Sequence, residues 1–352
     1  MGRFDDLAGL APAPAELVDI VDDSCLPVDL TAVVAGNFTQ PVPTILRRDD
    51  GQSLVYPGEV NGVHGSSGEG KGWLTLIAIV EQMRAGHAVM LLDLEDTAAS
   101  IVARLRILGA TDSDILERLV YIRPHVEFGP ISMAHYVMLV EQHRPSIVVV
   151  DSLGEAFGLE GINEDRDFEV GPWLRRVARR VADVGPAVWL VDHSTKANDN
   201  PLFPSGSKRK RAAITGASYL VTATMPLVAG QGGRLRVTCA KDRHGTYRRG
   251  EVVADAVFTP TQTGGLAPKL YTPSAVDTEP VVEFAVRAAV KAVRSSDVSP
   301  LPLRVLVEQM PIKCRKEAKY AAIDLAVARG LLSEAPGPRN SRLFTVVGDD
   351  ES

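Results

Sequence analysis

The stretch that decides the fold joins a short apolar strand to a glycine-rich loop and reads Glu59-Val60-Asn61-Gly62-Val63-His64-Gly65-Ser66-Ser67-Gly68-Glu69-Gly70-Lys71. A helical run follows it, from Trp73 to Arg84. Glycines let several backbone N–H groups face one anion, the helix adds the positive end of its dipole, and the lysine adds a mobile charge. The stretch therefore predicts a nucleotide site whose phosphates lie among Gly65, Ser66, Ser67, Gly68, Glu69, Gly70, Lys71, Gly72 and Trp73.

Gly72 departs from the usual form of this loop. The pattern G-x-x-x-x-G-K is met by Gly65, Gly70 and Lys71, but the next position normally carries a Ser or Thr hydroxyl that ligates Mg²⁺. Thr75 lies nearly a helical turn further along and is a poor substitute. A glycine-rich turn without function is the alternative, which the strand before the loop and the helix after it disfavour. We expect nucleotide binding to be retained and hydrolysis to be slow.

The composition is that of a soluble globular protein able to bury a sizeable core. The chain has 352 residues, of which 45% are hydrophobic and 23% charged, and its net charge is -6. Any contact with nucleic acid must therefore come from local basic patches. The three cysteines, Cys25, Cys239 and Cys314, have no paired spacing, and no apolar run approaches the roughly 18 residues that a membrane span needs. We expect a cytoplasmic protein without membrane contact.

Strands and helices alternate over most of the chain. Strand-like runs at 87–94, 119–122, 147–150 and 187–191 are separated by helical patterns at 98–108, 132–142 and 168–184, whereas the strands expected at 219–228, 234–240 and 251–258 have no helices between them. This order predicts an α/β fold in which helices cover both faces of a mostly parallel sheet that has an antiparallel extension.

Composition also suggests the domain boundaries. Residues 1–55 are acidic and contain prolines, and we interpret them as an N-terminal arm or adaptor, with a poorly ordered lead-in as an equal alternative. Residues 56–260 form the α/β domain, and 261–278, rich in Pro, Gly and Thr, form a linker. Residues 279–348 predict three helices and a hairpin, which is the pattern of a winged helix-turn-helix that could bind DNA or dock a protein. Its third helix is basic because it carries Lys313, Arg315, Lys316 and Lys319.

Acidic residues and a histidine follow the predicted strands, where ligands bind in parallel sheets. Asp151 follows a buried strand and could hold Mg²⁺, although a carboxylate that only caps the strand is the alternative. Glu95 follows the strand that ends near Asp93 and could orient or deprotonate the attacking water, or merely pair with a cation. Asp96 is expected to cap the next helix. His193 could sense the γ-phosphate, or be a histidine satisfied at a strand end.

Two groups of cations follow the same region. A predicted loop contains the run Lys208, Arg209, Lys210 and Arg211. These cations could bind a phosphodiester backbone without sequence specificity, although a solvated surface is an equal alternative. Lys241 and Arg243 could reach a γ-phosphate bound by the next subunit, as an arginine finger does, or be exposed charges at the rim.

Together these residues resemble the RecA/DnaB-like ATPases, most closely their RepA-like branch of plasmids, phages and mobile elements. The resemblance covers about Leu54 to Phe258 and rests on the loop ending at Lys71, on Glu95, on Asp151-Ser152, on Asp192-His193 and on Lys241-Asp242-Arg243. It implies a RecA-like fold, ATP and Mg²⁺ as cofactors, single-stranded DNA as a partner, and a homo-oligomeric ring such as a hexamer.

The resemblance also assigns roles. It implies that Lys71 binds phosphates, that Asp151 holds the metal, that Glu95 activates water, and that Lys241 and Arg243 complete a neighbour's site. The segment from Lys208 to Arg211 corresponds in place to a DNA-contacting loop. Two functions then remain open: a DNA translocase or helicase in mobile-element replication, and an ATP-gated DNA-binding or loading protein with weak or absent hydrolysis.

Overall fold

The computed structural model describes residues 27–37, 40–194, 202–228, 231–273, 279–310, 316–338 and 341–347. The chain divides into two compact units, Met1–Gln40 and Pro41–Ser352. The described part of the first unit contains the short helix α1 (Thr31–Val34). The acidic residues that begin the predicted arm, 1–26, lie outside the described residues.

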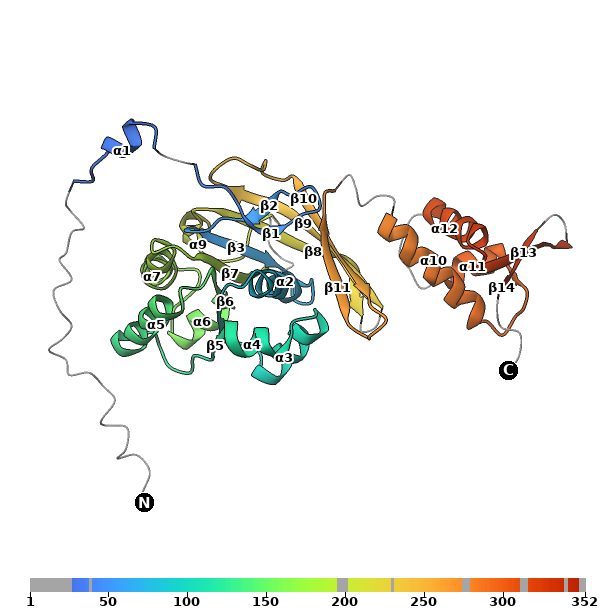
Figure 1. Cartoon of the computed structure of the whole chain (residues 1–352), viewed down its shortest axis with the longest axis horizontal. Coiled ribbons are helices and arrows are strands. Elements are labelled where there is room, and N and C mark those ends of the chain that lie inside the picture. The colour runs from blue at the N-terminus through green and yellow to red at the C-terminus, as the bar shows by residue number, and fades with distance from the viewer. Residues whose placement is uncertain are drawn as a thin grey trace, which may run out of the picture. The chain divides into compact units, whose positions relative to one another are not determined.

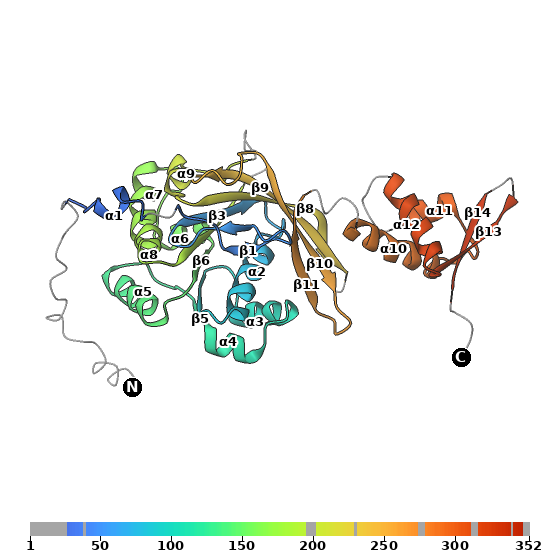
Figure 2. The same ribbon diagram turned by 45° about the horizontal axis from the view of Figure 1, so that its top comes forward.

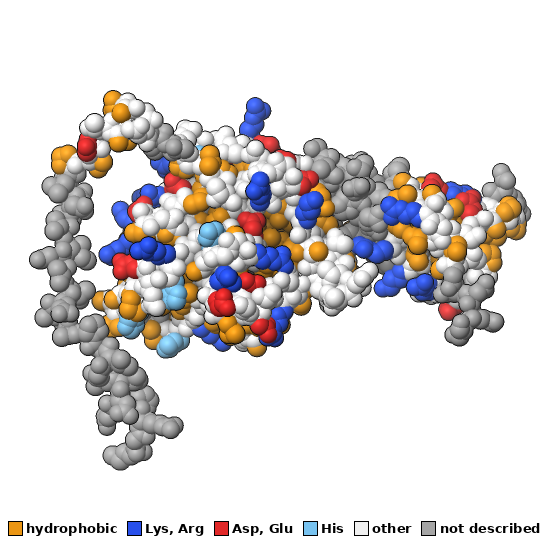
Figure 3. Space-filling model, viewed as in Figure 1, with side chains coloured by type: hydrophobic (Ala, Val, Ile, Leu, Met, Phe, Trp, Pro, Cys, Tyr) orange, Lys and Arg blue, Asp and Glu red, His pale blue; other side chains and the backbone are white. Residues whose placement is uncertain are grey.

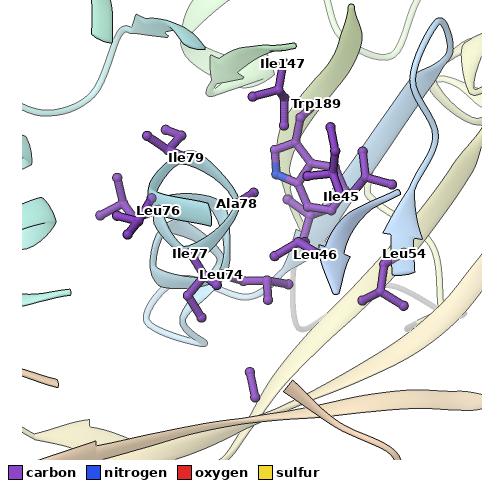
Figure 4. Close-up of a cluster of buried hydrophobic side chains, with 14 of the residues drawn as sticks. Ile45, Leu46, Leu54, Leu74, Leu76, Ile77, Ala78, Ile79, Ile147 and Trp189 are labelled. Atoms are coloured by element: carbon purple, nitrogen blue, oxygen red, sulfur yellow. The ribbon is translucent and has the colours of Figure 1, made fainter. Parts of the chain in front are cut away.

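The predicted arm is too long, because its last part belongs to the core of the second unit. Strands β1 (Ile45–Arg47) and β2 (Ser53–Val55) form an antiparallel hairpin, in which Leu46 and Leu54 are fully buried. The carboxylate of Glu81 accepts the backbone N–H of Leu46 and fastens the hairpin to a helix of the core. Figure 4 shows the hairpin side chains in one cluster with those of this helix and with Trp189. The apolar residues of this proline-containing segment therefore belong to the hydrophobic core and not to an arm.

A sheet of nine strands organises the second unit, in the order β11-β10-β9-β8-β3-β7-β6-β4-β5. The strands from β8 to β5 in this order are parallel, and β9, β10 and β11 extend the sheet in antiparallel fashion (Figures 1 and 2). The prediction of a mostly parallel sheet with an antiparallel extension is confirmed. The strands are β3 (Val60–Gly65), β4 (Val89–Asp93), β5 (Leu119–Ile122), β6 (Ile147–Asp151), β7 (Ala187–His193), β8 (Ala217–Val228), β9 (Gly232–Asp242), β10 (Val252–Pro260) and β11 (Leu266–Tyr271).

The edge strand β11 corrects the predicted linker. Residues 266–271 pair with β10 along its length, for example Leu270 with Ala256, and Leu270 is buried in the core. The Gly264-Gly265 pair that suggested a linker lies in the turn that joins the two strands. A turn and a linker share the same composition, so composition alone could not separate them.

Helices cover both faces of the sheet because both faces of its central strands are apolar. Successive side chains of a strand point to opposite faces, so Leu91 and Val149 enter one core cluster, whereas Met90 and Val148 enter the other. No helix in the described ranges is both long and apolar enough to cross a membrane. One face carries α2 (Lys71–Arg84), α3 (Ala98–Ile107) and α4 (Asp112–Arg118), and the other carries α5 (Pro130–His143), α6 (Leu153–Leu159), α7 (Asp167–Trp173), a π-helical segment (Leu174–Arg179) and α8 (Arg180–Ala182).

Residues 279–347 have a core of their own. The elements are α10 (Glu279–Arg294), β12 (Leu301–Pro302), α11 (Leu303–Gln309), α12 (Lys316–Ala328), β13 (Leu332–Pro336) and β14 (Arg342–Val346). The three strands form an antiparallel sheet in the order β12-β14-β13, and Ala289, Leu306, Ile323 and Phe344 are buried together. The three predicted helices and the hairpin are thus present. Of the basic residues expected on the third helix, Lys313 and Arg315 lie outside the described residues, and Lys319 donates to the carbonyl of Val307.

The glycines of the loop before α2 yield a test of the fold. Gly70, the N-cap of α2, has a φ of 87°, and a Cβ placed there would lie 2.5 Å from a methyl carbon of Leu235. We expect Gly70→Ala to lower the free energy of unfolding by about 2–3 kcal/mol, because it combines a left-handed backbone with a steric clash. Urea denaturation followed by tryptophan fluorescence measures this.

Gly72→Ala is the matched control for this experiment. A Cβ at Gly72 meets nothing within 4 Å, and the position lies in the first turn of α2. Replacing glycine by alanine within a helix should raise the free energy of unfolding by about 0.5–1 kcal/mol. Equal losses of stability in the two variants would contradict the described geometry of the loop.

Candidate functional site

The parallel strands end at one edge of the sheet, and their register brings the predicted site residues together. Gly65 at the end of β3 lies opposite His193 at the end of β7. Asp151 at the end of β6 lies opposite Asp93 at the end of β4. The loop from Gly65 to Gly70 leaves the same edge and leads directly into α2. The N-terminal N–H groups of α2 lack partners within the helix, so they favour an anion at this position.

A cleft of about 610 Å³ lies over this edge. Asp151, Glu95 and His193 line it together with residues from α2, from α3 and from the end of β8. Gly65, Ser66 and Glu69 of the predicted phosphate-binding set are not among its lining residues, and the Glu69 carboxylate accepts the backbone N–H of Ala223 in β8. The members of the predicted set that do line the cleft are Ser67, Gly68, Gly70, Lys71, Gly72 and Trp73.

Lys71 points back into its own loop. Its Nζ donates to the carbonyl oxygens of Gly65, at 2.8 Å, and Ser66, at 3.0 Å, and lies 3.4 Å from Nδ1 of His193. Burial lowers the pKa of Lys71, and the charges of Asp151 and Glu95 oppose this effect. The ammonium group is therefore held by weak neutral acceptors close to the position where phosphates are predicted to bind.

Glu95 and His193 are paired across the cleft. The Nε2 atom of His193 lies 2.9 Å from Oε1 of Glu95, and the Ser152 hydroxyl donates to the same oxygen. The hydrogen bond from His193 is the main reason that the pKa of Glu95 falls to about 2, and the Ser152 bond adds to it. A neutral His193 with its proton on Nε2 can donate to Glu95 and accept from Lys71 at the same time. Glu95 is therefore ionised at neutral pH.

Asp151 has the opposite electrostatic environment. Burial, reinforced by the charges of Glu95 and Asp93, raises the pKa of Asp151 to about 7. Asp93 itself accepts the backbone N–H of Glu95 and the Tyr121 hydroxyl. Three carboxyl groups thus crowd one edge of the sheet, and a divalent cation would relieve their mutual repulsion.

This donor set fits Mg²⁺ better than a metal held by protein ligands alone. The described residues contain no group of three or more His, Cys, Asp or Glu that could hold a metal. Mg²⁺ is usually bound through one or two carboxylates, several waters and the phosphates of the substrate. Asp151 would be the protein ligand. Thr75 does not replace the hydroxyl missing at Gly72, since its buried Oγ1 accepts the indole N–H of Trp189 at 3.0 Å.

The sequence missed several residues of the cleft. The sequence assigns no role to Ser152, yet its hydroxyl donates a hydrogen bond to the Glu95 carboxylate. The prediction that Asp96 caps α3 is wrong, because Thr97 is the N-cap and Asp96 pairs with Arg104 at 2.7 Å. The remaining lining residues come from segments far apart in sequence, so no local pattern predicts them. They are Leu76, Leu91, Ile101, Arg104, Val191, Pro226 and Leu227.

The basic run is not the exposed loop that its composition predicts. Residues 208–213 form a short helix, α9 (Lys208–Ala213), which directs Lys208 and Arg209 outward and Lys210 inward. The Nζ of Lys210 lies 3.1 Å from Oδ1 of Asp192 and 2.9 Å from Oε2 of Glu164, and its side chain is 2% exposed. Lys210 therefore cannot contact DNA in this structure. Because neighbouring residues of a helix point in different directions, Lys210 is buried while Lys208 and Arg209 are exposed.

Lys241 and Arg243 lie away from the cleft of their own chain. Lys241 pairs in register with Ser218 near the start of β8, whereas the phosphate-binding loop follows the end of β3. Its Nζ donates to the carbonyl oxygens of Arg211 and Ile214, at 2.7 and 2.6 Å. Arg243 is exposed. Neither cation can act on a nucleotide in the same subunit.

The comparisons with known proteins agree with the cleft. Residues 28–199 match the family model described as "AAA domain". The matched region includes the hairpin β1–β2, the glycine-rich loop, the strands that end at Asp151 and His193, and the turn after β4 that contains Glu95. No curated protein matches the chain. The similarity supports a nucleotide-binding P-loop domain of the ATPase type in this part of the chain.

The raised pKa of Asp151 predicts a pH-dependent cost to stability. The folded protein keeps this proton up to about pH 7, whereas the unfolded chain releases it near pH 4. Stability therefore falls as the pH rises between these values. Without Mg²⁺, we expect Asp151→Asn to raise the free energy of unfolding by about 1–3 kcal/mol at pH 8 and by nothing near pH 4. Urea titrations with EDTA at several pH values measure this.

Glu95→Gln should behave in the opposite way. The pKa of Glu95 falls to about 2 in the folded protein, so its charge stabilises the fold above about pH 4.5. This contribution is lost as the pH drops toward 2. Glu95→Gln should therefore destabilise the protein at pH 8 and have less effect at low pH. A pH-independent difference in both variants would contradict the electrostatic account.

Proposed function

We propose that the chain is an ATPase of the RecA/RepA-like type that binds ATP and Mg²⁺ in the cleft and acts on single-stranded DNA as a ring-forming translocase or helicase. The observation that carries the proposal is the convergence of Lys71, Asp151, Glu95 and His193 on one cleft beside a helix N-terminus. Asp151 and His193 end strands β6 and β7, and Glu95 lies two residues after the end of β4.

Each residue of the cleft has a defined role in this proposal. Lys71 would exchange its two carbonyl acceptors for phosphate oxygens, which bind an ammonium group more strongly. His193 would then lose its bond from Lys71 and become available to the terminal phosphate. Glu95 would accept the proton of the attacking water once His193 releases it. Mg²⁺, when bound at Asp151, would neutralise charge on the phosphates.

A ring follows from the position of Arg243 in the proposal. Because Lys241 and Arg243 lie near the start of β8, they can complete a nucleotide site only in a neighbouring subunit. Arg243 is exposed, whereas Lys241 is engaged by two carbonyl oxygens, so Arg243 is the better arginine finger. Lys208, Arg209 and Arg211 remain as DNA contacts, and Lys210 is withdrawn from that set.

The C-terminal elements support a winged helix in the same proposal. Three helices, a short strand before α11 and the hairpin β13–β14 occur in the order of that fold. The described exposed residues of α12 are Lys316, Ala321, Asp324 and Ala328, and Asp324 pairs with Arg342 at 2.6 Å. An acid at its centre favours protein docking over DNA binding for this helix.

A second function is favoured by Gly72 and by the pairing of Glu95. Without a hydroxyl at position 72, and with the base held by His193 and Ser152, hydrolysis would be slow. The protein would then be an ATP-gated DNA-binding or loading protein. The two functions share the nucleotide site and differ in turnover.

Turnover with and without DNA tests the first function. We expect ATP hydrolysis to rise at least about fivefold with single-stranded DNA, and Lys71→Ala to reduce it about 100-fold, because the phosphates lose their charged partner. Steady-state phosphate release measures both. Nucleotide affinity, from a fluorescent ATP analogue, should fall in Lys71→Ala as well. Hydrolysis that is indifferent to DNA would exclude the translocase.

Gly72→Ser separates the two functions. The position has room for a Cβ, so the hydroxyl can be restored without steric cost. We expect hydrolysis to rise about 5–10-fold at unchanged ATP affinity, since Mg²⁺ gains an oxygen ligand. Gly72→Ala, which adds the Cβ without the hydroxyl, is the control. Faster hydrolysis without better DNA unwinding would favour the loading protein, and an unchanged, already brisk rate would favour the translocase.

A further inference from the structure

Two arginines from distant segments contact one phenylalanine. The guanidinium carbon of Arg211 in α9 lies 4.1 Å from the ring centre of Phe203, and that of Arg249 lies 4.7 Å from the same centre. The Phe203 ring is 9% exposed. Arg249 belongs to the turn between β9 and β10, residues 243–251. Stacking on a ring holds a guanidinium in place while its N–H edges stay available.

Further cations surround this pair. Arg243 and Arg248 lie in the same turn, and both are exposed. Burial lowers the pKa of Lys241, and the nearby charges of Arg243 and Arg211 lower it further. Among the described residues, none of these four arginines forms a side-chain ion pair, although the Glu251 carboxylate accepts the backbone N–H of Arg248 at 2.9 Å. We call Arg211, Arg248, Arg249 and Phe203 the arginine cluster; Arg243 lies beside it and keeps its proposed role toward a neighbouring subunit.

The arginine cluster differs in charge from the rest of the chain. The chain carries a net charge of -6. On the face shown in Figure 3, Lys and Arg side chains of the large domain are interspersed with Asp and Glu. Like charges repel, so arginines that lie close together favour the binding of an anion between them. None of the cluster residues lines the nucleotide cleft.

We propose that the arginine cluster binds the phosphodiester backbone of single-stranded nucleic acid, and that Arg248 and Arg249 extend the DNA-binding surface from α9 to the β9–β10 turn. The proposal rests on the proposed function for its partner. A single strand offers a row of phosphates that can engage several cations at once, and its bases can stack on guanidinium planes.

Salt-dependent binding tests this proposal with the full chain. Fluorescence anisotropy of a labelled oligothymidine is measured for wild type, Arg211→Ala and Arg249→Ala at several salt concentrations. Each variant should bind about tenfold more weakly, and the slope of log affinity against log salt should shrink by about 0.7 for each phosphate that the variant no longer neutralises. Arg249→Lys should be intermediate, because it keeps the charge and loses the planar stack on Phe203.

Arg106→Ala is the matched control, since Arg106 is a 58% exposed arginine on α3 that pairs with Asp112 at 2.8 Å. It should bind the oligonucleotide as wild type does. Melting temperatures establish whether each variant is folded. If Arg211→Ala does not fold, Arg249→Ala alone tests the proposal. Wild-type affinity and salt slope in Arg249→Ala would overturn the proposal.

A second outcome would also overturn it. If Arg249→Ala binds DNA normally but loses hydrolysis that mixing with Lys71→Ala subunits restores, the cluster serves a neighbour's phosphates instead. Binding of a fluorescent ATP analogue is measured on the same samples. If the variants bind ATP and bind DNA as wild type does, only the proposal for the arginine cluster is wrong. If the wild-type protein binds no ATP, the proposed function is wrong.

Discussion

The register of the parallel strands is the constraint on which the site depends. Parallel neighbours end at the same edge of a sheet, so Gly65, Asp93, Asp151 and His193 meet there although they are far apart in sequence. The apolar residues of β4, β6 and β7 fix that register by filling both cores. A shift of one residue would exchange the two faces of a strand. Packing and chemistry are thus set by the same strands.

The electrostatics of the cleft are those of a site built for charged ligands. Asp151 is buried beside two other acids, and its pKa of about 7 reflects that cost. Lys71 is buried too, yet its hydrogen bonds go to carbonyl oxygens of its own loop. A nucleotide with a divalent cation supplies a negative partner for the lysine and a positive one for the acid. Binding can therefore use free energy that folding has left stored in unpaired charges.

Much of the fold could be predicted because its signals are local and periodic. Continuous apolar strands indicate the parallel sheet, and the glycine pattern before α2 locates the loop. The sequence does not predict the hairpin at Leu46 or the edge strand at Leu270, since short strands flanked by proline and glycine have the composition of arms and linkers. That Lys71, Glu95, Asp151 and His193 line one cleft follows from their places in the loop and after the strands. Ser152 and the apolar wall of the cleft depend on packing between distant segments, which one sequence does not show.

The basic residues show why a charge run alone does not identify a surface. Lys210 lies within the run of four cations, but α9 turns it inward, where Asp192 and Glu164 neutralise it. The ammonium group of Lys241 donates to the carbonyl oxygens of Arg211 and Ile214 at the end of α9. Packing around this helix thus withdraws part of the positive charge from the surface.

The contact of Lys210 also connects α9 to the cleft. Asp192, which holds Lys210, directly precedes His193, which pairs with Glu95 and faces Lys71. The backbone N–H of His193 donates to the same oxygen of Asp192 that Lys210 contacts. The acceptor that anchors α9 is therefore also bound by the backbone of His193. The end of β7 is where the nucleotide cleft and the basic helix share a structural element.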